Sequence, residues 1–408
     1  MDLGKSTRVK PILAAVQRFI AERVEPLEQE YFKEVDDGDR WQLTERQTEI
    51  IETLKSEARG QGLWNFFLTH SDRGPGLNTV EYAYLAEAMG HSHLAPEAFN
   101  CSAPDTGNME VIERFGSEAQ KQQWLHPLLE GKIRSAFAMT EPDVACADAT
   151  NVAMSAVRQG DEWVLNGEKS YISGAGDPRC KILIVMARSN PGAKRHQQQS
   201  QILVPMDTPG LTIVRPMAVF AMDDAPHGHM HLKFDQVRVP KDNVILGPGR
   251  GFEIAQGRLG PGRIHHCMRA VGAAERALEL MCRRGLSRTA FGKPLVKLGG
   301  NYDRIADARI QIEMARLLTL KAAWMMDCTQ MDCSKLPEAQ VWISMIKVAA
   351  PNVALKIIDD SIQMHGSAGV SQDFPLAGMY MANRTLRLAD GPDEVHRMVV
   401  ARAELKRY

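Results

Sequence analysis

A cluster of carboxylates lies close to the end of the chain, in the stretch RLADGPDEVHR at 387–397. Asp390, Asp393 and Glu394 surround a Gly-Pro break, and the residues that follow are typical of a helix. A carboxylate in the first turn of a helix stabilises the positive end of the helix dipole. A carboxylate can also act as a general base, which removes a proton from a substrate within hydrogen-bonding reach. The residue types alone allow both roles.

Two further patterns with chemical potential are weak. The stretch ILGPGRGFEIA at 245–255 resembles a dinucleotide fingerprint, but Phe252 stands where a third glycine is required and no β-α-β unit surrounds it. His227, His229 and His231 would share one face of a strand, yet no acidic or cysteine ligand follows at a familiar spacing. We therefore predict neither a dinucleotide fold nor a metal site. G-x-S-x-G and Walker motifs are also absent from the sequence.

The composition argues against several classes of protein. The chain has 408 residues, with 49 basic and 50 acidic side chains and a formal net charge of −1. This balance disfavours a nucleic-acid partner, whose phosphates require a clustered basic surface. The sequence has no run of eighteen apolar residues, so we expect no membrane span, and we expect no secretory or peroxisomal signal. The seven cysteines form no C-x-x-C pair, so we expect reduced cysteines in a cytoplasmic protein.

Hydrophobic periodicity divides the chain into three zones, which must position any site. Residues 1–131 and 246–408 carry apolar side chains at three- and four-residue spacing, which predicts helices. Residues 132–245 carry short runs rich in apolar residues, such as KILIVMAR, separated by turn residues, which predict strands. We therefore predict an α+β multidomain protein. It has an N-terminal helical domain, a central antiparallel, β-barrel-like domain and a C-terminal four-helix bundle.

Local signals predict where some elements begin and end. Asn78 is typical of an N-cap, Gly90 is typical of a helix end, and Ser117 stands three residues before a glutamine, which is capping-box spacing. The Asn-Gly pair at 166–167 lies between two alternating runs. Such a pair is a strong hairpin signal, so we predict a turn there.

Four dispersed stretches gain meaning when they are compared together with the acidic one. They are FAMTEPDVACAD (137–148), YISGAG (171–176), SRTAFGKPL (287–295) and QMHGSAGV (363–370). In this order, the five stretches resemble the acyl-CoA dehydrogenase family of flavoproteins, and most closely the subgroup of family members ten and eleven. The resemblance covers nearly the whole chain. It implies FAD as the cofactor, an acyl-CoA thioester as the substrate and an electron-transfer flavoprotein as the acceptor.

The resemblance also implies a role for the acidic stretch. In the family, a glutamate before a glycine near the C-terminus removes the α-proton of the thioester while the β-hydrogen leaves as hydride to flavin N5, giving a trans-2-enoyl-CoA. Asp390 and Gly391 align with that pair. Because an aspartate is shorter by about 1.5 Å, the backbone or the substrate must be shifted. Asp393 or Glu394 would then be the acids of the first helical turn.

Further residues are assigned to the cofactor and the substrate by the same resemblance. For FAD these are Phe137, Met139, Thr140, Tyr171, Ile172, Ser173, Arg288, Phe291, Gln363, Gly366, Ser367, Pro392 and Glu394, and for the acyl-CoA they are Ala147, Arg263 and Gly391. Arg288 and Phe291 would reach the FAD of a neighbouring subunit, which implies a homodimer or homotetramer. An arginine near a glycine-bearing turn supplies the planar cation and backbone N–H groups that a pyrophosphate needs.

Two other functions stay open from the sequence. Nitroalkane oxidase is a flavoprotein relative with an aspartate base, so an oxygen-using oxidase of the same fold, acting on an acyl-CoA or a nitroalkane, is one alternative. The alternative of another class is a non-catalytic protein that binds acyl-CoA or flavin. In that protein Asp390 would only cap the last helix.

Overall fold

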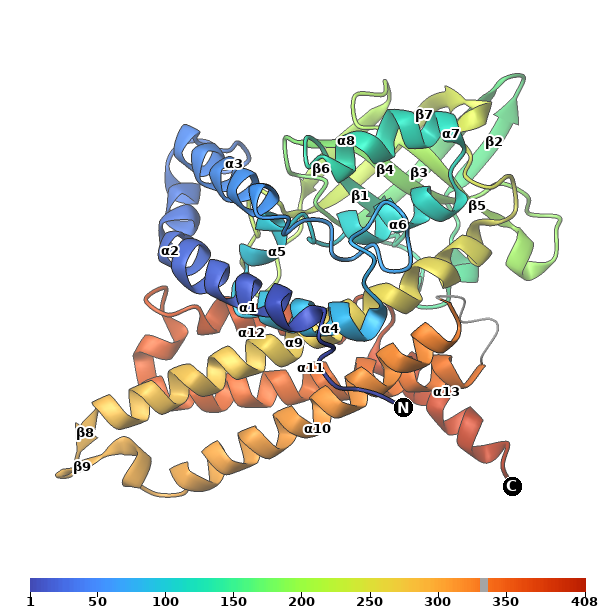
Figure 1. Cartoon of the computed structure of the whole chain (residues 1–408). Coiled ribbons are helices and arrows are strands. Elements are labelled where there is room, and N and C mark those ends of the chain that lie inside the picture. Colours follow the sequence, from blue (N-terminus) through green and yellow to red (C-terminus); the bar gives the residue numbers. More distant parts are fainter. Residues whose placement is uncertain (331–336) are drawn as a thin grey trace. The chain divides into compact units, whose positions relative to one another are not determined.

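The structure, a computed structural model, describes residues 1–330 and 337–408 (Figure 1). Helices come first along the chain, strands follow and long helices return, which confirms the predicted α+β order. The chain forms two compact units. We call Met1–Pro26, Thr69–Pro96 and Gly260–Tyr408 the helical unit, and Leu27–Leu68 with Glu97–Leu259 the sheet unit.

Long helices dominate the helical unit. Its elements are α1 (Val9–Phe19), η1 (Ile20–Val24), α4 (Thr79–Met89), most of α9 (Gly251–Ser287), β8 (Thr289–Ala290), β9 (Lys293–Pro294), η7 (Leu295–Lys297), α10 (Asn301–Cys328), α11 (Pro337–His365), η8 (Gly366–Val370), α12 (Leu376–Thr385) and α13 (Asp393–Leu405). Helix α11 packs against α10, α12 and α13. Figure 1 shows α9, α10 and α11 running along one another, which confirms the predicted C-terminal bundle.

Helix α11 and the turn after it are unusually apolar. Among the described residues, Pro337–Val370 is the one helical segment whose length and composition would allow it to cross a membrane. A core helix of a globular protein has the same length and composition, and 56% of the most apolar stretch is buried here. Two lysines, Lys347 and Lys356, interrupt the apolar residues. They explain why the sequence shows no continuous apolar run of that length.

Two glycines let α4 and α9 pack closely. A Cβ atom added at Gly272 would lie 1.9 Å from the carbonyl oxygen of Glu87, and one added at Gly90 would lie 2.2 Å from the carbonyl oxygen of Arg269. Protein interiors are close-packed, so no larger residue fits at these positions without moving a backbone. Gly90 ends α4, as predicted, but its backbone is right-handed. Helix packing, and not a left-handed turn, therefore requires the glycine.

Seven strands form the central sheet of the sheet unit. They are β1 (Arg134–Ala138), β2 (Ser155–Gln159), β3 (Glu162–Ser173), β4 (Cys180–Arg188), β5 (Gln199–Pro205), β6 (Leu211–Pro216) and β7 (His229–Pro240). Their order is β1-β4-β2-β3-β7-β6, and β5 pairs with β4. Most neighbours are antiparallel, as predicted, but β1 and β2 each run parallel to β4. The long connection between β1 and β4, which includes β2 and β3, makes the parallel pairing feasible.

Short helices and 3₁₀ turns accompany this sheet. Those wholly or partly in the sheet unit are α2 (Glu25–Lys33), η2 (Glu34–Asp36), α3 (Glu45–Gly60), α5 (Ala95–Ala98), α6 (Asp105–Phe115), α7 (Glu118–Gln120), η3 (Lys121–Leu125), α8 (His126–Leu129), η4 (Ala149–Asn151), η5 (Arg195–Gln197) and η6 (Lys241–Asn243). The sheet has its own apolar core, which includes Leu165, Val185 and Phe234. This core holds the strand ends, and with them the predicted flavin segments, in fixed register.

The predicted helix starts are confirmed, and the predicted hairpin turn is wrong. Asn78 and Ser117 each begin a helix in a complete capping box. The Asn-Gly pair at 166–167 is not a turn, because β3 runs through it and the β2–β3 hairpin turns at 160–161 instead. Gly167 lies at a register shift, and a Cβ atom added there would be 2.8 Å from Cγ of Met154. The close approach of the Met154 side chain to the backbone explains why a glycine stands here.

Candidate active site

Asp390 lies in the turn between α12 and α13, held by its backbone. Its carbonyl oxygen accepts hydrogen bonds from Nε of Arg263 at 3.0 Å and from Nε2 of His396 at 3.3 Å. The next residue, Gly391, has φ +99°, and a Cβ atom added there would lie 3.0 Å from Nε2 of His396. These contacts fix the peptide around Asp390 and leave its carboxylate partly exposed, at 20%. The arrangement suits a side chain that must meet a substrate.

Asp393 has the structural role that the sequence left open. It is buried, and its carboxylate accepts hydrogen bonds from Nε of Arg387 at 2.8 Å and Nδ2 of Asn352 at 3.1 Å. Its own N–H donates to the carbonyl of Arg387 at 3.2 Å. These bonds close the turn before α13. Glu394 is exposed in the first turn of that helix. The two roles considered for the acidic stretch therefore fall on different residues, and Asp390 remains the candidate base.

Nitrogen-bearing side chains gather around Asp390. Nε2 of His266 lies 3.6 Å from Oδ2 of Asp390. Lys347 is almost fully buried and donates to the carbonyl of Leu386, and burial lowers its pKa. Burial likewise lowers the pKa of His396 to about 4, so its ring is neutral at pH 7. A carboxylate surrounded by such groups has a fixed position and a polar environment.

These neighbours were missed at the level of the sequence. His266 stands three residues after Arg263, so both lie on one face of α9. That spacing was the available signal. The preceding His265 faces a different direction: it is buried, with its ring 4.6 Å from that of Tyr82. Lys347 and His396 gave no signal, because their approach to Asp390 depends on how α11 and α13 pack.

Five of the residues predicted to contact FAD come from the ends of α9 and α11 and the segments that follow them. Arg288 and Phe291 lie in the β8–β9 hairpin, and Phe291 at its tip is 93% exposed. Gln363, Gly366 and Ser367, at the end of α11, are all exposed as well. The ends of α9 and α11 touch, since Nη2 of Arg284 donates to the carbonyl of His365 at 3.2 Å. All five residues are exposed, and they follow or precede helix ends that touch.

The predicted flavin-ring segments lie side by side in the sheet unit. The N–H of Ser170 donates to the carbonyl of Thr140 at 2.9 Å, and the Thr140 hydroxyl donates to the carbonyl of Ser170. Phe137, at the end of β1, and the following Met139 are half-buried, while Thr140 is exposed. At the end of β3, Ile172 is buried, Ser173 is half-buried and Tyr171 is 51% exposed. The two segments therefore present hydroxyl groups and apolar side chains on a common support.

A buried ion pair holds the first of these segments. Nζ of Lys169 donates to the carbonyls of Met139 at 2.8 Å and Met186 at 2.7 Å, and to Oε1 of Glu141 at 2.8 Å. The Glu141 carboxylate also accepts the N–H groups of Ala153 and Met154. Burial lowers the pKa of Lys169, which is completely inaccessible. An ammonium with three acceptors in the interior fixes the chain after β1 tightly.

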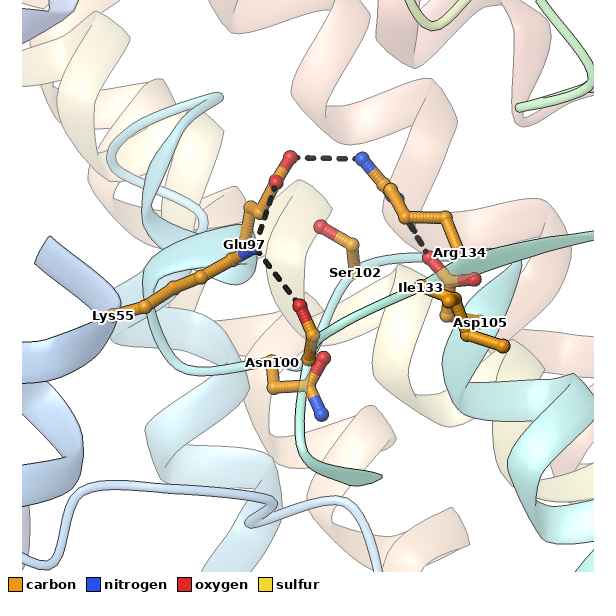
Figure 2. Close-up of a pocket in the computed structure, with 8 residues that line it drawn as sticks. Lys55, Glu97, Asn100, Ser102, Asp105, Ile133 and Arg134 are labelled. Atoms are coloured by element: carbon orange, nitrogen blue, oxygen red, sulfur yellow. Dashed lines mark hydrogen bonds and ion pairs between the residues drawn. The ribbon is translucent and has the colours of Figure 1, made fainter. Parts of the chain in front are cut away.

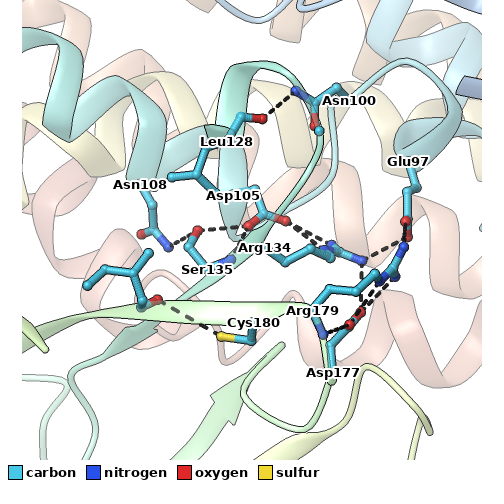
Figure 3. Close-up of polar contacts among 12 residues, drawn as sticks. Glu97, Asn100, Asp105, Asn108, Leu128, Arg134, Ser135, Asp177, Arg179 and Cys180 are labelled. Atoms are coloured by element: carbon cyan, nitrogen blue, oxygen red, sulfur yellow. Dashed lines mark hydrogen bonds and ion pairs between the residues drawn. The ribbon is translucent and has the colours of Figure 1, made fainter. Parts of the chain in front are cut away.

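A larger group of charges fixes the opposite end of β1. We call Lys55, Glu97, Asp105, Arg134, Asp177 and Arg179 the buried ion cluster. Figure 3 draws all of them except Lys55, which Figure 2 shows. Figure 3 shows Arg134 between Asp105 and Glu97, with Nε 2.9 Å from Asp105 and Nη1 2.8 Å from Glu97. Burial alone would raise the pKa of Glu97, but Arg179, Arg134 and Lys55 hold it well below its usual range. The three cations balance the three anions, as burial of charge requires.

A small pocket lies within the buried ion cluster. Figure 2 shows Lys55, Glu97, Asp105 and Arg134 among the residues that line it. Its cavity volume is about 10 Å³, which is roughly the space of one water molecule. The pocket therefore has no room for an acyl chain or a cofactor, and we assign it a structural role.

Three predicted site residues share an uncommon backbone conformation. Tyr171, Phe291 and Asp390 have φ values of +53°, +50° and +54°, in the left-handed region that non-glycine residues seldom occupy. Such conformations cost free energy and are concentrated at functional sites. The three residues come from a strand end, a hairpin tip and an interhelical turn. Other described residues, such as Phe220, share this conformation, so it marks an unusual backbone at the three predicted residues and does not by itself assign them to a site.

Two further predicted residues, and the histidines at 227, 229 and 231, lie in loops and at the ends of regular elements. Ala147 is exposed in the loop before η4, and Pro392 is the N-cap residue of α13. His227 is half-buried, His229 faces Ser173 at 2.9 Å, and His231 contacts Glu168 at 2.8 Å. Within residues 1–330 and 337–408, no group of three or more His, Cys, Asp or Glu side chains is arranged so that it could hold a metal ion.

Comparison with known proteins accounts for the whole chain. Residues 8–132, 136–237 and 249–405 match the models of the acyl-CoA dehydrogenase N-terminal, middle and C-terminal domains. A solved structure described as a putative acyl-CoA dehydrogenase from Mycobacterium abscessus is 53% identical, with a TM-score of 0.94. The match covers 99% of this chain and all of that one.

Curated relatives agree with these matches. The chain is 56% identical over 359 residues to "Probable acyl-CoA dehydrogenase FadE2" of Mycobacterium tuberculosis, covering 88% of this chain and 86% of that protein. It is 52% identical over 408 residues to "Acyl-CoA dehydrogenase family member 10" of Mus musculus, covering 99% of this chain. The chain spans only 37% of that longer protein, and about half of the family member 11 proteins that it matches.

Proposed function

Because the chain belongs to the acyl-CoA dehydrogenase family, we propose that it oxidises an acyl-CoA thioester to the trans-2-enoyl-CoA with Asp390 as the base. One observation carries this proposal: Asp390 is held by its carbonyl oxygen, in a strained conformation, with its carboxylate partly exposed. A side chain with only a capping role needs no such support, and Asp393 already closes the turn.

FAD is the cofactor of this family, and the residues described here fit it. The strained, half-exposed Tyr171 and the hydroxyls of Thr140 and Ser173 offer a ring system both apolar contact and hydrogen bonds. Arg288 and the exposed turn at Gly366 offer a cation and backbone N–H groups to a diphosphate. When bound, the flavin accepts the hydride that leaves the β-carbon.

The protein's own task in this reaction is proton removal and positioning. Asp390 takes the α-proton as the β-hydrogen leaves, and Arg263 and His396 keep the Asp390 peptide in place. Charge then develops on the thioester oxygen, and the backbone N–H of the base is the donor that the family resemblance assigns to it. One such preorganised donor contributes about 3–4 kcal/mol to transition-state stabilisation.

The further parts of the proposal rest on family membership. We propose an electron-transfer flavoprotein as the acceptor, and a homodimer or homotetramer in which Arg288 and Phe291 meet the FAD of a neighbouring subunit. The 93% exposure of Phe291 supports the second part, since a phenyl ring at a hairpin tip gains free energy when a partner covers it.

Substitution of the base tests the proposal. The Asp390→Asn variant is expected to keep its yellow FAD after gel filtration and to lose flavin bleaching when mixed anaerobically with a panel of acyl-CoA thioesters. The panel also identifies the preferred chain length. Bleaching at a near-wild-type rate would show that Asp390 is not the base. Hydrogen peroxide formation without an acceptor, or bleaching by a nitroalkane alone, would instead indicate the oxidase alternative.

A further inference from the structure

The end of β3 contains a hydrogen bond that neither the family resemblance nor the proposed reaction explains. Oγ of Ser173 lies 2.9 Å from Nδ1 of His229, the first residue of β7. The two residues are direct partners in the antiparallel register of β3 and β7, which lie side by side in Figure 1. The sheet itself therefore builds this contact, and it does not depend on a loop.

The imidazole of His229 has one proton, and its neighbours decide where that proton lies. Its pKa is lowered by burial, so the ring is neutral at pH 7. Nε2 lies 3.7 Å from the Asp224 carboxylate, a strong acceptor. A neutral imidazole donates from one nitrogen and accepts at the other. The proton is therefore favoured on Nε2, which leaves Nδ1 as an acceptor for the Ser173 hydroxyl.

The loop that carries Asp224 is firmly held. Nε and Nη2 of Arg40 donate to the neighbouring Asp223 carboxylate at 3.0 and 2.8 Å. The carbonyl of Asp224 accepts the N–H of Gly228 at 2.7 Å, and the carbonyl of Gly228 accepts the N–H of Gly174, the residue after Ser173, at 3.0 Å. Asp224, His229 and the end of β3 are thus parts of one hydrogen-bonded arrangement.

We propose that His229 is a positioning residue that fixes the direction of the Ser173 hydroxyl, so that Ser173 offers an acceptor to the bound flavin. A hydroxyl that donates to Nδ1 has only its oxygen lone pairs left for a third group. Hydride transfer adds a hydrogen to flavin N5 and converts that nitrogen from an acceptor into a donor. With FAD bound so that Ser173 faces this nitrogen, the hydroxyl oxygen would favour the hydrogenated ring over the oxidised one. The inference rests on the proposed function, because it requires FAD beside Ser173.

Reduction potentials measure this effect directly, without turnover. In His229→Ala the Ser173 hydroxyl is free to donate, and the two-electron midpoint potential of bound FAD is expected to become more negative. A tenfold loss of preference for the reduced form corresponds to about 30 mV. In His229→Asn the amide oxygen takes the place of Nδ1, so the potential is expected to return toward the wild-type value. The matched control is His231→Asn, two residues along β7, which contacts Glu168 instead.

Double substitution separates positioning from general damage. In a Ser173→Ala background, the change His229→Ala is expected to leave the potential unmoved, because the hydroxyl it orients is gone. An unchanged potential in His229→Ala with FAD fully bound would overturn the inference, and so would an equal shift in the Ser173→Ala background. Loss of acyl-CoA bleaching in Asp390→Asn tests the proposed reaction separately. A protein that shows the potential shifts but never bleaches with any thioester would refute only that reaction.

Discussion

Nε2 of His266 lies 3.6 Å from Oδ2 of Asp390. The two side chains are 23% and 20% exposed and come from α9 and from the turn before α13. Arg263, one turn earlier on α9, donates to the carbonyl of Asp390 at 3.0 Å. One face of a single helix therefore supports both the backbone and the carboxylate of the candidate base, across more than a hundred residues of sequence.

Removal of this support is expected to slow proton abstraction. The His266→Leu variant should reduce bound flavin roughly ten- to a hundredfold more slowly, because small misplacements of a catalytic group have effects of that size. Stopped-flow bleaching with a saturating acyl-CoA measures the rate, and the flavin absorbance after gel filtration should be unchanged. His93→Leu, an exposed histidine of the same unit, is the control. A His266→Leu rate within twofold of wild type would show that the contact is incidental.

The buried ion cluster is expected to be far more sensitive than surface ion pairs. Glu97→Gln leaves Arg134 and Arg179 without a full counter-charge, and loss of one partner of a buried pair costs about 3–5 kcal/mol of unfolding free energy. Urea unfolding measures the loss. Glu49→Gln breaks the exposed pair with Arg46, at 2.7 Å, and should cost less than about 1 kcal/mol. Similar values for the two variants would contradict a structural role for the cluster.

Much of the fold was predictable because local patterns and tertiary packing agree. The periodicity of the long C-terminal helices, the N-cap at Asn78 and the capping box at Ser117 all proved correct. The Asn-Gly pair at 166–167 misled, because a glycine inside a strand can serve close packing against Met154 as well as a turn. Gly90 likewise ends α4 but is required by the approach of α9.

Only those site residues that lie in sequence motifs could be predicted. Motif resemblance predicts Asp390, Tyr171 and Phe291 as site residues, and this stays a prediction; all three have a left-handed backbone. His266 and His229 were missed as site residues. His266 contacts the Asp390 carboxylate, and His229 contacts the Ser173 hydroxyl. Each histidine is far from its partner in the sequence, and no spacing rule connects the two. Such pairs depend on helix packing and strand register, which the sequence does not display.

Stability is expected to fall as the pH is lowered from about 6.5 to 4. Burial lowers the pKa of His396 from 6.5 to about 4, so in this interval the unfolded chain binds a proton that the folded chain does not. The folded state therefore loses up to about 3 kcal/mol from this group on acidification, and nothing further below its folded pKa. Burial also lowers the pKa of other histidines, namely His91, His227, His229, His265 and His365.

Urea unfolding at pH 7 and pH 5 checks this expectation. Wild type should be less stable at pH 5, and His396→Asn should show a smaller difference between the two pH values, whatever its stability at pH 7. The difference should not vanish, because the other histidines remain. His93→Asn, at an exposed position, serves as the control. An identical pH difference in His396→Asn and wild type would rule out His396 as a contributor.

The exposed ring of Phe291 links assembly to cofactor retention. It is 93% exposed at a hairpin tip with φ +50°, three residues after Arg288. Phe291→Ser is expected to weaken both subunit association and FAD retention, the latter by about tenfold, because a central aromatic side chain in an interface commonly contributes more than 1 kcal/mol. Sedimentation velocity and flavin absorbance after gel filtration measure the two effects.

Phe220→Ser, at another exposed phenylalanine with φ +50°, is the matched control and should change neither effect. If the ring serves both functions, the two losses occur together. A Phe291→Ser protein that stays oligomeric but releases FAD would show that the ring contacts only the cofactor. An oligomer that also keeps its FAD would remove Phe291 from the site.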